Sequence, residues 1–235
     1  FGLAGMALAA SLIGFTALNP DSGFVGDIVV LIYLLTIPAI ALIMGASASG
    51  NPIAAVGASR EMKQLLAYEL PYLIVIATVI YKAGFDLYIR SIMRQQVQHG
   101  WFLWSLSGVI GFVVLLLSAQ AKLGLVPYDA PEAEQEIMGG IITEYSGPPL
   151  AIIKITKTML FAVMPLFISV LLLGGISANG MGLLWTILKY HAIVVLMVLI
   201  RNTNPRVRID QTVSFFWVPM TILALAGLGL AIIGL

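Results

Sequence analysis

Cysteine is absent from the 235 residues, and charged side chains make up only 10% of them. A chain without thiols forms no disulfide, no thiolate metal site and no cysteine-bound iron–sulfur cluster. An ordinary soluble domain carries about 25% charged residues, so this composition excludes a water-soluble fold. The few basic residues are scattered and form no groove-sized patch, which argues against a nucleic-acid partner.

Apolar residues are abundant, at 60% of the chain, and they gather into long runs. Runs of roughly 18 or more apolar residues are typical of transmembrane helices, and helices satisfy every backbone polar group within lipid. The sequence therefore predicts an all-α polytopic membrane protein, with residues 1–235 forming a single transmembrane domain. Seven spans are expected, at about 2–18, 28–44, 68–88, 101–120, 150–174, 181–200 and 212–235.

The connections between these spans indicate the orientation in the membrane. Alternation places the connections 47–63, 121–149 and 201–210 on one side, which holds more Lys and Arg than the other side. Cytoplasmic loops are enriched in basic residues. We therefore expect a cell-membrane protein whose acidic loop, 121–149, faces the cytoplasm.

That loop carries the densest set of carboxylates in the chain. Asp129 has the position of a helix cap with Glu132 at the third helical position, and Glu132 and Glu136 would share one helix face while Glu134 takes another. Glu144 follows just beyond the helix. Such carboxylates can share and release protons as a coupled set. A solvated acidic loop fits the same pattern, and the residues alone leave both interpretations open.

Further ionisable residues lie within or beside the predicted spans: Glu69, Lys154, Lys157, Lys189 and His191. A charge at a helix centre costs roughly 2.5–3.5 kcal/mol, so such residues usually mark a proton or ion path. For Glu69 and Lys154 the alternative is a side chain that reaches back to the interface. His191 has no second histidine or carboxylate at ligand spacing, so we expect no metal site.

A basic turn at 201–210 separates the last two spans. It anchors the chain by the positive-inside rule, and its side chains can also dock a soluble partner or pair with the acidic loop. We expect five residues to serve in docking: Arg60, Arg201, Arg206, Arg208 and Asp210.

Three blocks carry a resemblance to a known family. They are GASRE at 57–61 running on to YE at 68–69, PYDAPEAEQE at 127–136 continuing through TEYSG at 143–147, and PRVRIDQ at 205–211. With these blocks in this order, nearly the whole chain resembles the subunit 1 family of NADH:quinone oxidoreductase (respiratory complex I), the H-type membrane subunits. It resembles most closely the counterparts in energy-converting membrane-bound NiFe hydrogenases and in the related archaeal sulfane sulfur reductase.

The resemblance implies eight transmembrane helices in the whole protein, with one N-terminal helix missing here. It implies a subunit without its own redox centre, joined to peripheral iron–sulfur and hydrogenase-like subunits and to antiporter-like membrane subunits. Iron–sulfur clusters, and a NiFe centre in the hydrogenase branch, would lie in those partners. The implied function is the coupling of electron transfer to translocation of H⁺ or Na⁺, through the acidic loop and Glu69.

Other functions remain open at this point. Within the family, three interpretations are open: a quinone-binding subunit of NADH:quinone oxidoreductase, a hydrogenase subunit, and a sulfane sulfur reductase subunit. In another class, it is a stand-alone secondary ion transporter, although the two related halves expected of transporters are absent from the sequence. A structural membrane anchor without a part in ion movement is the third class.

Overall fold

The computed structural model describes residues 1–18, 26–176 and 180–234, without the side chains of residues 17, 18, 134 and 135. The described residues form helices and connecting segments, with no strand among them. The helices, in chain order, are α1 Gly2–Leu18, α2 Asp27–Ala48, α3 Pro52–Lys82, α4 Ile89–His99, α5 Leu106–Lys122, α6 Glu134–Ile137, α7 Gly147–Leu172, α8 Gly180–Thr203, α9 Ile209–Phe215 and α10 Thr221–Ile233.

Seven apolar units among the described helices match the seven predicted spans. Five are long and apolar enough to cross a bilayer, namely α2, α3, α7, α8 and the continuous unit Ile209–Ile233; α1 and α5 are shorter apolar helices. Within the last unit the turn Phe216–Met220 is a π-helix around Pro219. Proline has no N–H for the helical ladder. Beside it, the backbone N–H and the hydroxyl of Thr221 both donate to the Phe216 carbonyl, the hydroxyl at 2.8 Å. The prediction of an all-α polytopic membrane protein is confirmed.

Helix α3 is longer than predicted. The segment 47–63 was expected to be a connection, but α2 continues to Ala48 and α3 begins at Pro52. The Asn51 side chain caps α3 by accepting from the Ile53 N–H at 2.8 Å, and proline is well suited to a first helical turn. A helix of 31 residues spans about 46 Å, which exceeds the roughly 30 Å hydrocarbon core, so one end of α3 extends beyond the membrane.

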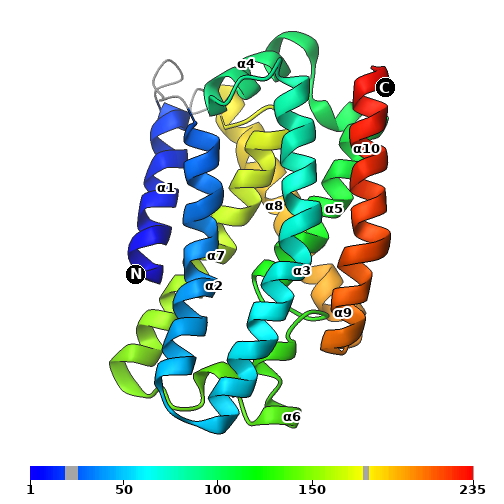
Figure 1. Ribbon diagram of the computed structural model, residues 1–235. Coiled ribbons are helices and arrows are strands. Elements are labelled where there is room, and N and C mark those ends of the chain that lie inside the picture. The colour runs from blue at the N-terminus through cyan, green and yellow to red at the C-terminus, as the bar shows by residue number, and fades with distance from the viewer. Residues whose placement is uncertain (19–25, 177–179, 235) are drawn as a thin grey trace.

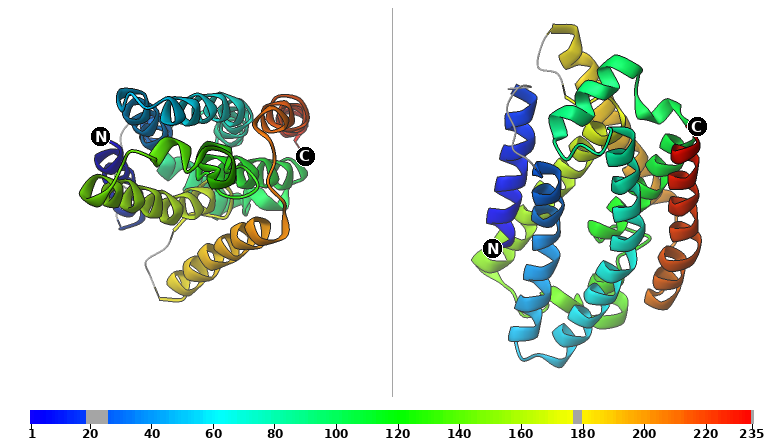
Figure 2. Two further views of the ribbon diagram at one scale, coloured as in Figure 1. Left: turned by 90° about the horizontal axis from the view of Figure 1, so that it is seen from below. Right: turned by 45° about the horizontal axis from the view of Figure 1, so that its top comes forward.

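The bundle is arranged around α3, which contacts α2, α5, α9 and α10 as well as the acidic loop. Its buried side chains include Tyr68 and Tyr72, and Tyr72 packs beside Phe167 of α7. Helix α4 lies across one end of the bundle (Figure 1), and α8 diverges from the other helices (Figure 2). Only three described residues of α8 are buried: Thr186, Ile193 and Met197.

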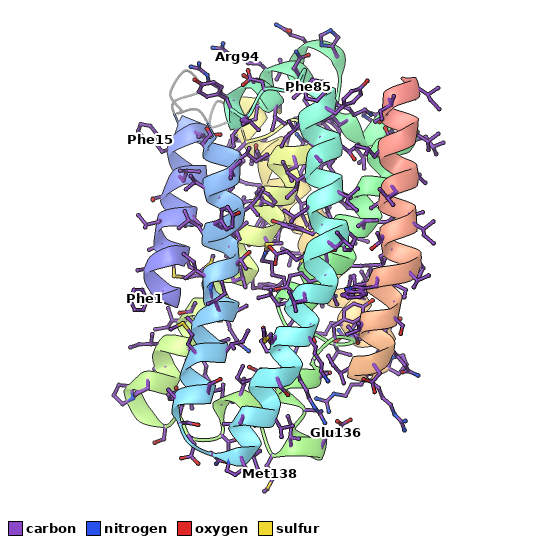
Figure 3. All side chains as sticks on the ribbon, viewed as in Figure 1. Phe1, Phe15, Phe85, Arg94, Glu136 and Met138 are labelled. Atoms are coloured by element: carbon purple, nitrogen blue, oxygen red, sulfur yellow. The ribbon has the colours of Figure 1, made fainter. Side chains whose placement is uncertain are left out.

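The two ends of the bundle differ in their chemistry. Figure 3 places Glu136 and Met138 at the end opposite Arg94 and Phe85. The three connections predicted to share one side do meet at the Glu136 end, because 47–63 and 201–210 both contact the acidic loop. The Glu136 end therefore gathers the charges that the sequence assigned to the cytoplasmic side.

Candidate functional site

The acidic loop is held against the bundle at its start by a buried glutamine. The Gln64 amide of α3 donates to the Ala121 carbonyl at 2.8 Å and to the Tyr128 carbonyl at 2.6 Å. The Tyr128 ring packs on Phe215 and Phe216, with ring centroids 6.1 and 5.0 Å away. These contacts fix the backbone just before the first carboxylate, Asp129.

The Tyr128 ring also makes the docking of the loop dependent on pH. Burial raises the pKa of Tyr128 to about 12, whereas an unfolded tyrosine titrates near 10. The folded state therefore holds the phenolic proton more tightly than the unfolded state does. The contribution of neutral Tyr128 to folding stability is complete below about pH 10 and is lost between about pH 10 and 12. We expect the wild type to lose on the order of 2 kcal/mol over this range relative to Tyr128→Phe, measured by thermal unfolding at several pH values. Equal losses in both proteins would contradict this.

Each described carboxylate of the loop has a partner on a different part of the chain. Asp129 accepts from Arg206 of the basic turn, with Nε–Oδ2 at 2.7 Å and Nη2–Oδ2 at 2.6 Å. Glu132 pairs with Lys157 of α7. Glu136 pairs with Arg60 of α3 at 2.6 Å, and Glu144 accepts from the Asn51 side chain.

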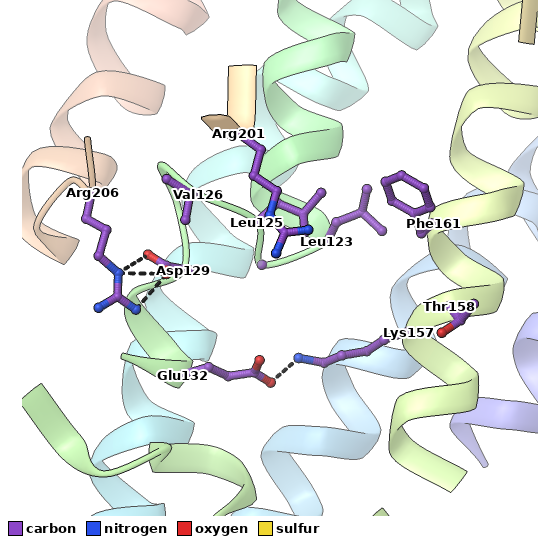
Figure 4. Close-up of a pocket in the computed structure, with 11 residues that line it drawn as sticks. Leu123, Leu125, Val126, Asp129, Glu132, Lys157, Thr158, Phe161, Arg201 and Arg206 are labelled. Carbon is purple, nitrogen blue, oxygen red and sulfur yellow. Dashed lines mark hydrogen bonds and ion pairs between the residues drawn. The ribbon is translucent and has the colours of Figure 1, made fainter. Parts of the chain in front are cut away.

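Two of these pairs border an open cleft of about 690 Å³ (Figure 4). Asp129–Arg206 and Glu132–Lys157 line one part of it, and the Arg201 side chain reaches into it from the end of α8. Apolar side chains complete the wall: Leu123, Leu125, Val126 and Phe161. The cleft therefore has a charged part and an apolar part.

A much smaller cavity, about 20 Å³, lies deeper. It is lined by Glu61, Lys122, Asp129, Glu132 and Lys157. A volume of roughly this size holds one water molecule when polar groups surround it. The cavity thus brings the ion pair Glu132–Lys157 together with Lys122, whose side chain points into the core.

The Lys122 ammonium continues the polar series inward. It donates to the Thr36 hydroxyl at 3.0 Å, and the Thr36 hydroxyl lies 3.2 Å from Glu69 Oε1. The ammonium also sits over the Tyr72 ring, 4.6 Å from its centroid. Glu69 is therefore not a side chain that reaches back to an interface; it belongs to a polar cluster inside the bundle.

The predicted helix of the acidic loop is wrong in its details. Asp129 makes no capping hydrogen bond because Arg206 engages its carboxylate. Glu132 ends the short 3-10 turn Ala130–Glu132, and Glu136 lies in the separate one-turn helix α6. The two glutamates consequently point to different cations instead of sharing one helix face. The Glu134 side chain lies outside the described residues.

Three predicted ion-path residues lie apart from the charged cluster. Lys154 is exposed on α7 and forms no ion pair with another described residue. Lys189 donates to the Leu173 carbonyl at the end of α7 and covers the Trp101 ring at 4.3 Å. The exposed His191 ring bonds to the Ile187 carbonyl of its own helix at 2.8 Å.

The predicted docking residues have different surroundings. Arg60 and Arg206 hold the acidic loop, and Arg201 lines the cleft. Arg208 and Asp210 are exposed at the start of α9, where the Gln211 side chain accepts from the Arg208 N–H at 3.3 Å.

Sequence reasoning missed three members of the buried cluster: Glu61, Lys122 and Thr36. Lys122 falls within the predicted loop 121–149 and Glu61 within the block GASRE at 57–61, and neither was singled out. Helical spacing could have indicated Glu61, because it lies eight residues before Glu69, on the same side of α3 after about two turns. No signal in the sequence singles out Thr36.

Comparison with known proteins identifies what this arrangement is similar to. A family model described as NADH dehydrogenase matches residues 1–232. The H-type subunits of NADH-quinone oxidoreductase from Bacillus thuringiensis (strain Al Hakam) and Bacillus cereus (strain AH187) are each 34% identical over 197 residues, which is 82% of this chain and 58% of theirs. The chain thus matches little more than half the length of these relatives.

A solved structure extends the likeness to the fold. One chain of the membrane-bound sulfane sulfur reductase, an archaeal respiratory membrane complex, superposes with a TM-score of 0.87 at 28% identity. The match covers 98% of this chain and 78% of that one. Because the family model covers nearly all of the sequence, the chain belongs to the NADH dehydrogenase family.

Proposed function

We propose that this chain is a membrane-arm subunit of a respiratory oxidoreductase complex and couples electron transfer in a peripheral arm to translocation of H⁺ or Na⁺. The redox centres would be iron–sulfur clusters, with a NiFe centre in a hydrogenase-type complex, held by partner subunits. Antiporter-like membrane subunits would receive the signal laterally. The complex would lie in the cell membrane with the acidic loop on the cytoplasmic side.

One observation carries the proposal: a series of polar groups that runs from the loop into the core and is bridged at one point by a small cavity. It begins at the pair Glu132–Lys157, passes the small cavity lined by Glu61, and reaches Lys122 and then Glu69 through Thr36. Buried ionisable residues in a membrane protein are costly and usually serve ion or proton movement. A structural anchor would not need this series.

The loop end of the series can respond to a neighbouring redox reaction. Lys157 lines the cavity together with Glu61 and Glu132, so the cation stands near two carboxylates but pairs with one. A charge change in a partner above Glu132 would alter how strongly that carboxylate holds Lys157. The Lys157 ammonium would then interact more strongly with Glu61. This movement of charge would change the electric field at Lys122, because Coulomb interactions are strong where water is scarce.

Lys157 offers a direct test, and the exposed Lys63 of α3 offers a matched control lysine. In the intact complex, Lys157→Gln should lower ion translocation per electron at least about tenfold, since proton-transfer groups commonly contribute 10²-fold or more. Electron transfer and assembly should persist. Lys63→Gln removes an equal charge from an exposed position on α3 and should leave translocation near the wild-type level. Equal translocation in the wild type and Lys157→Gln would sink the proposal.

The same measurement covers the remaining predicted residues. Glu134, Glu136, Glu144, Lys154, Lys189 and His191 stay predicted members of the coupling path, and Arg208 and Asp210 stay predicted docking residues. For Glu136→Gln and Glu144→Gln we expect intact assembly and weakened ion translocation. Their neutralisation loosens the contacts with Arg60 and Asn51 that hold the loop on α3.

The terminal electron acceptor is a separate part of the proposal. The Bacillus relatives are named for NADH and quinone, and the structural match comes from a sulfane sulfur reductase. We favour a ferredoxin-linked, hydrogenase-like complex on the sequence resemblance. Gentle purification followed by mass spectrometry tests this, since copurifying hydrogenase-like subunits support it and NADH-oxidising subunits contradict it. Isolation without any redox subunit would instead favour a stand-alone transporter.

A further inference from the structure

The hydroxyl of Thr36 joins a buried lysine to a half-buried glutamate that does not pair with it directly. Lys122 is only 4% exposed, and Thr36 is 6% exposed. The ammonium donates to Thr36 Oγ1 at 3.0 Å, and Glu69 Oε1 lies 3.2 Å from the same oxygen. No ion pair links Lys122 to Glu69 in the part of the chain that the structure describes.

We infer that the Thr36 hydroxyl is the proton-transfer link between Lys122 and Glu69; this inference rests on the proposed coupling function and assigns one step within it. In that step an N–H bond of the Lys122 ammonium breaks as its proton bonds to Thr36 Oγ1. The original O–H bond of Thr36 breaks as that proton bonds to Glu69 Oε1. A charged lysine and carboxylate become a neutral amine and a carboxylic acid, and the hydroxyl is regenerated.

The surroundings of Thr36 allow this link to be open or closed. A hydroxyl has one proton to donate, and Thr36 Oγ1 lies within reach of two acceptors, the Ile32 carbonyl at 3.0 Å and Glu69 at 3.2 Å. With the proton on the Ile32 side the link is broken, and rotation of the hydroxyl toward Glu69 completes it. The oxygen itself need not move.

Neighbouring groups favour exchange of charge at this place. Glu69 Oε2 and the hydroxyls of Tyr68 and Tyr72 are buried without hydrogen-bond partners among the described residues. Unsatisfied buried polar atoms are uncommon and are costly next to a full charge. After the transfer Lys122 and Glu69 are both uncharged, which lowers the cost of burying the unsatisfied polar atoms beside them. The charged and neutral states of these two residues are therefore closer in energy than the two states of an isolated ion pair would be.

The test compares three variants in the intact complex, with ion translocation per electron as the readout. Thr36→Val keeps the shape but removes the hydroxyl, and it should lower translocation at least about tenfold while electron transfer continues. Thr36→Ser restores the hydroxyl and should restore most of the translocation. Thr78→Val is the control, because the buried Thr78 hydroxyl donates to the Ile74 carbonyl of its own helix, at 2.9 Å.

Glu69→Gln is measured beside the three threonine variants, and two translocation results overturn the inference. If Glu69→Gln stops translocation but Thr36→Val does not, the coupling function stands and the link is wrong. If neither variant changes translocation, the coupling function itself fails. Infrared difference spectra of the wild-type complex during turnover give a second measurement that does not depend on Thr36→Val folding. They should show a protonated-carboxyl band that disappears in Glu69→Gln, and its absence also overturns the link.

Discussion

Replacing Gly57 with alanine should detach the acidic loop from α3. A β-carbon at this position would lie 2.5 Å from the Ile141 nitrogen and 2.8 Å from the Gly140 carbonyl carbon. Both are backbone atoms, so the clash is not relieved by turning a side chain. Ala54 and Ala58 flank this contact and are buried with Ile141, which shows that small residues let the loop approach the helix closely.

The expected cost of Gly57→Ala is about 1–3 kcal/mol, as for other overpacked sites. The larger effect is on function, because the pairs Arg60–Glu136 and Asn51–Glu144 depend on the same close approach. We expect faster proteolysis within 129–146 and loss of coupled translocation. Translocation here means ions moved per electron in the assembled complex.

Gly229→Ala is the matched control for this variant. Gly229 lies in α10, and a β-carbon there meets nothing within 4 Å. The same substitution should therefore be neutral or stabilising by roughly 0.5–1 kcal/mol, since alanine is the better helix former. Protease protection of the loop in Gly57→Ala equal to that in Gly229→Ala would show that the loop does not depend on this contact.

The helices of this fold were readable from the sequence, because long apolar runs have no other stable arrangement in a membrane. The start of α3 at Pro52 could not be predicted from hydropathy. Residues 53–63 combine small, basic and apolar side chains, and hydropathy does not distinguish a loop from a helix that leaves the bilayer. The signal that was overlooked is local: Asn51 and Pro52 form a cap and first turn.

The charged site was likewise only partly predictable from the sequence. Density of carboxylates was enough to predict the acidic loop as the place of interest, and Asp129 and Glu132 do line the cleft. Pairing of the loop with the basic turn was one of the expected roles of that turn, and Arg206 does pair with Asp129. The partner of Glu132 was not predictable, since Lys157 lies 25 residues away on another helix. Tertiary pairing also removed the predicted capping role of Asp129. The sequence around Asp129 favours a helix cap, but Arg206 binds the same carboxylate oxygens with two nitrogen atoms.

Removing the buried charge at Lys122 should have the second large effect. Lys122→Met keeps an unbranched apolar side chain but takes away the ammonium that lies against Thr36, Tyr72 and Tyr68. Glu69 is then left in the core without its cation. Removing one partner of a direct buried ion pair commonly costs about 3–5 kcal/mol. Because Thr36 stands between these two groups, we expect a loss of up to about 3 kcal/mol, which corresponds to a fall in Tm on the order of 10 °C for a chain of this size.

A double variant separates the structural part of this loss from the functional part. Lys122→Met with Glu69→Gln removes both charges, so most of the lost Tm should return, because a neutral amide is far cheaper to bury than an unpaired carboxylate. Translocation should not return, since neither proton-binding group remains. The coupling energy of such a cycle isolates the interaction between the two sites. Strictly additive losses in Tm would show that Lys122 and Glu69 act independently, and that Thr36 does not connect them.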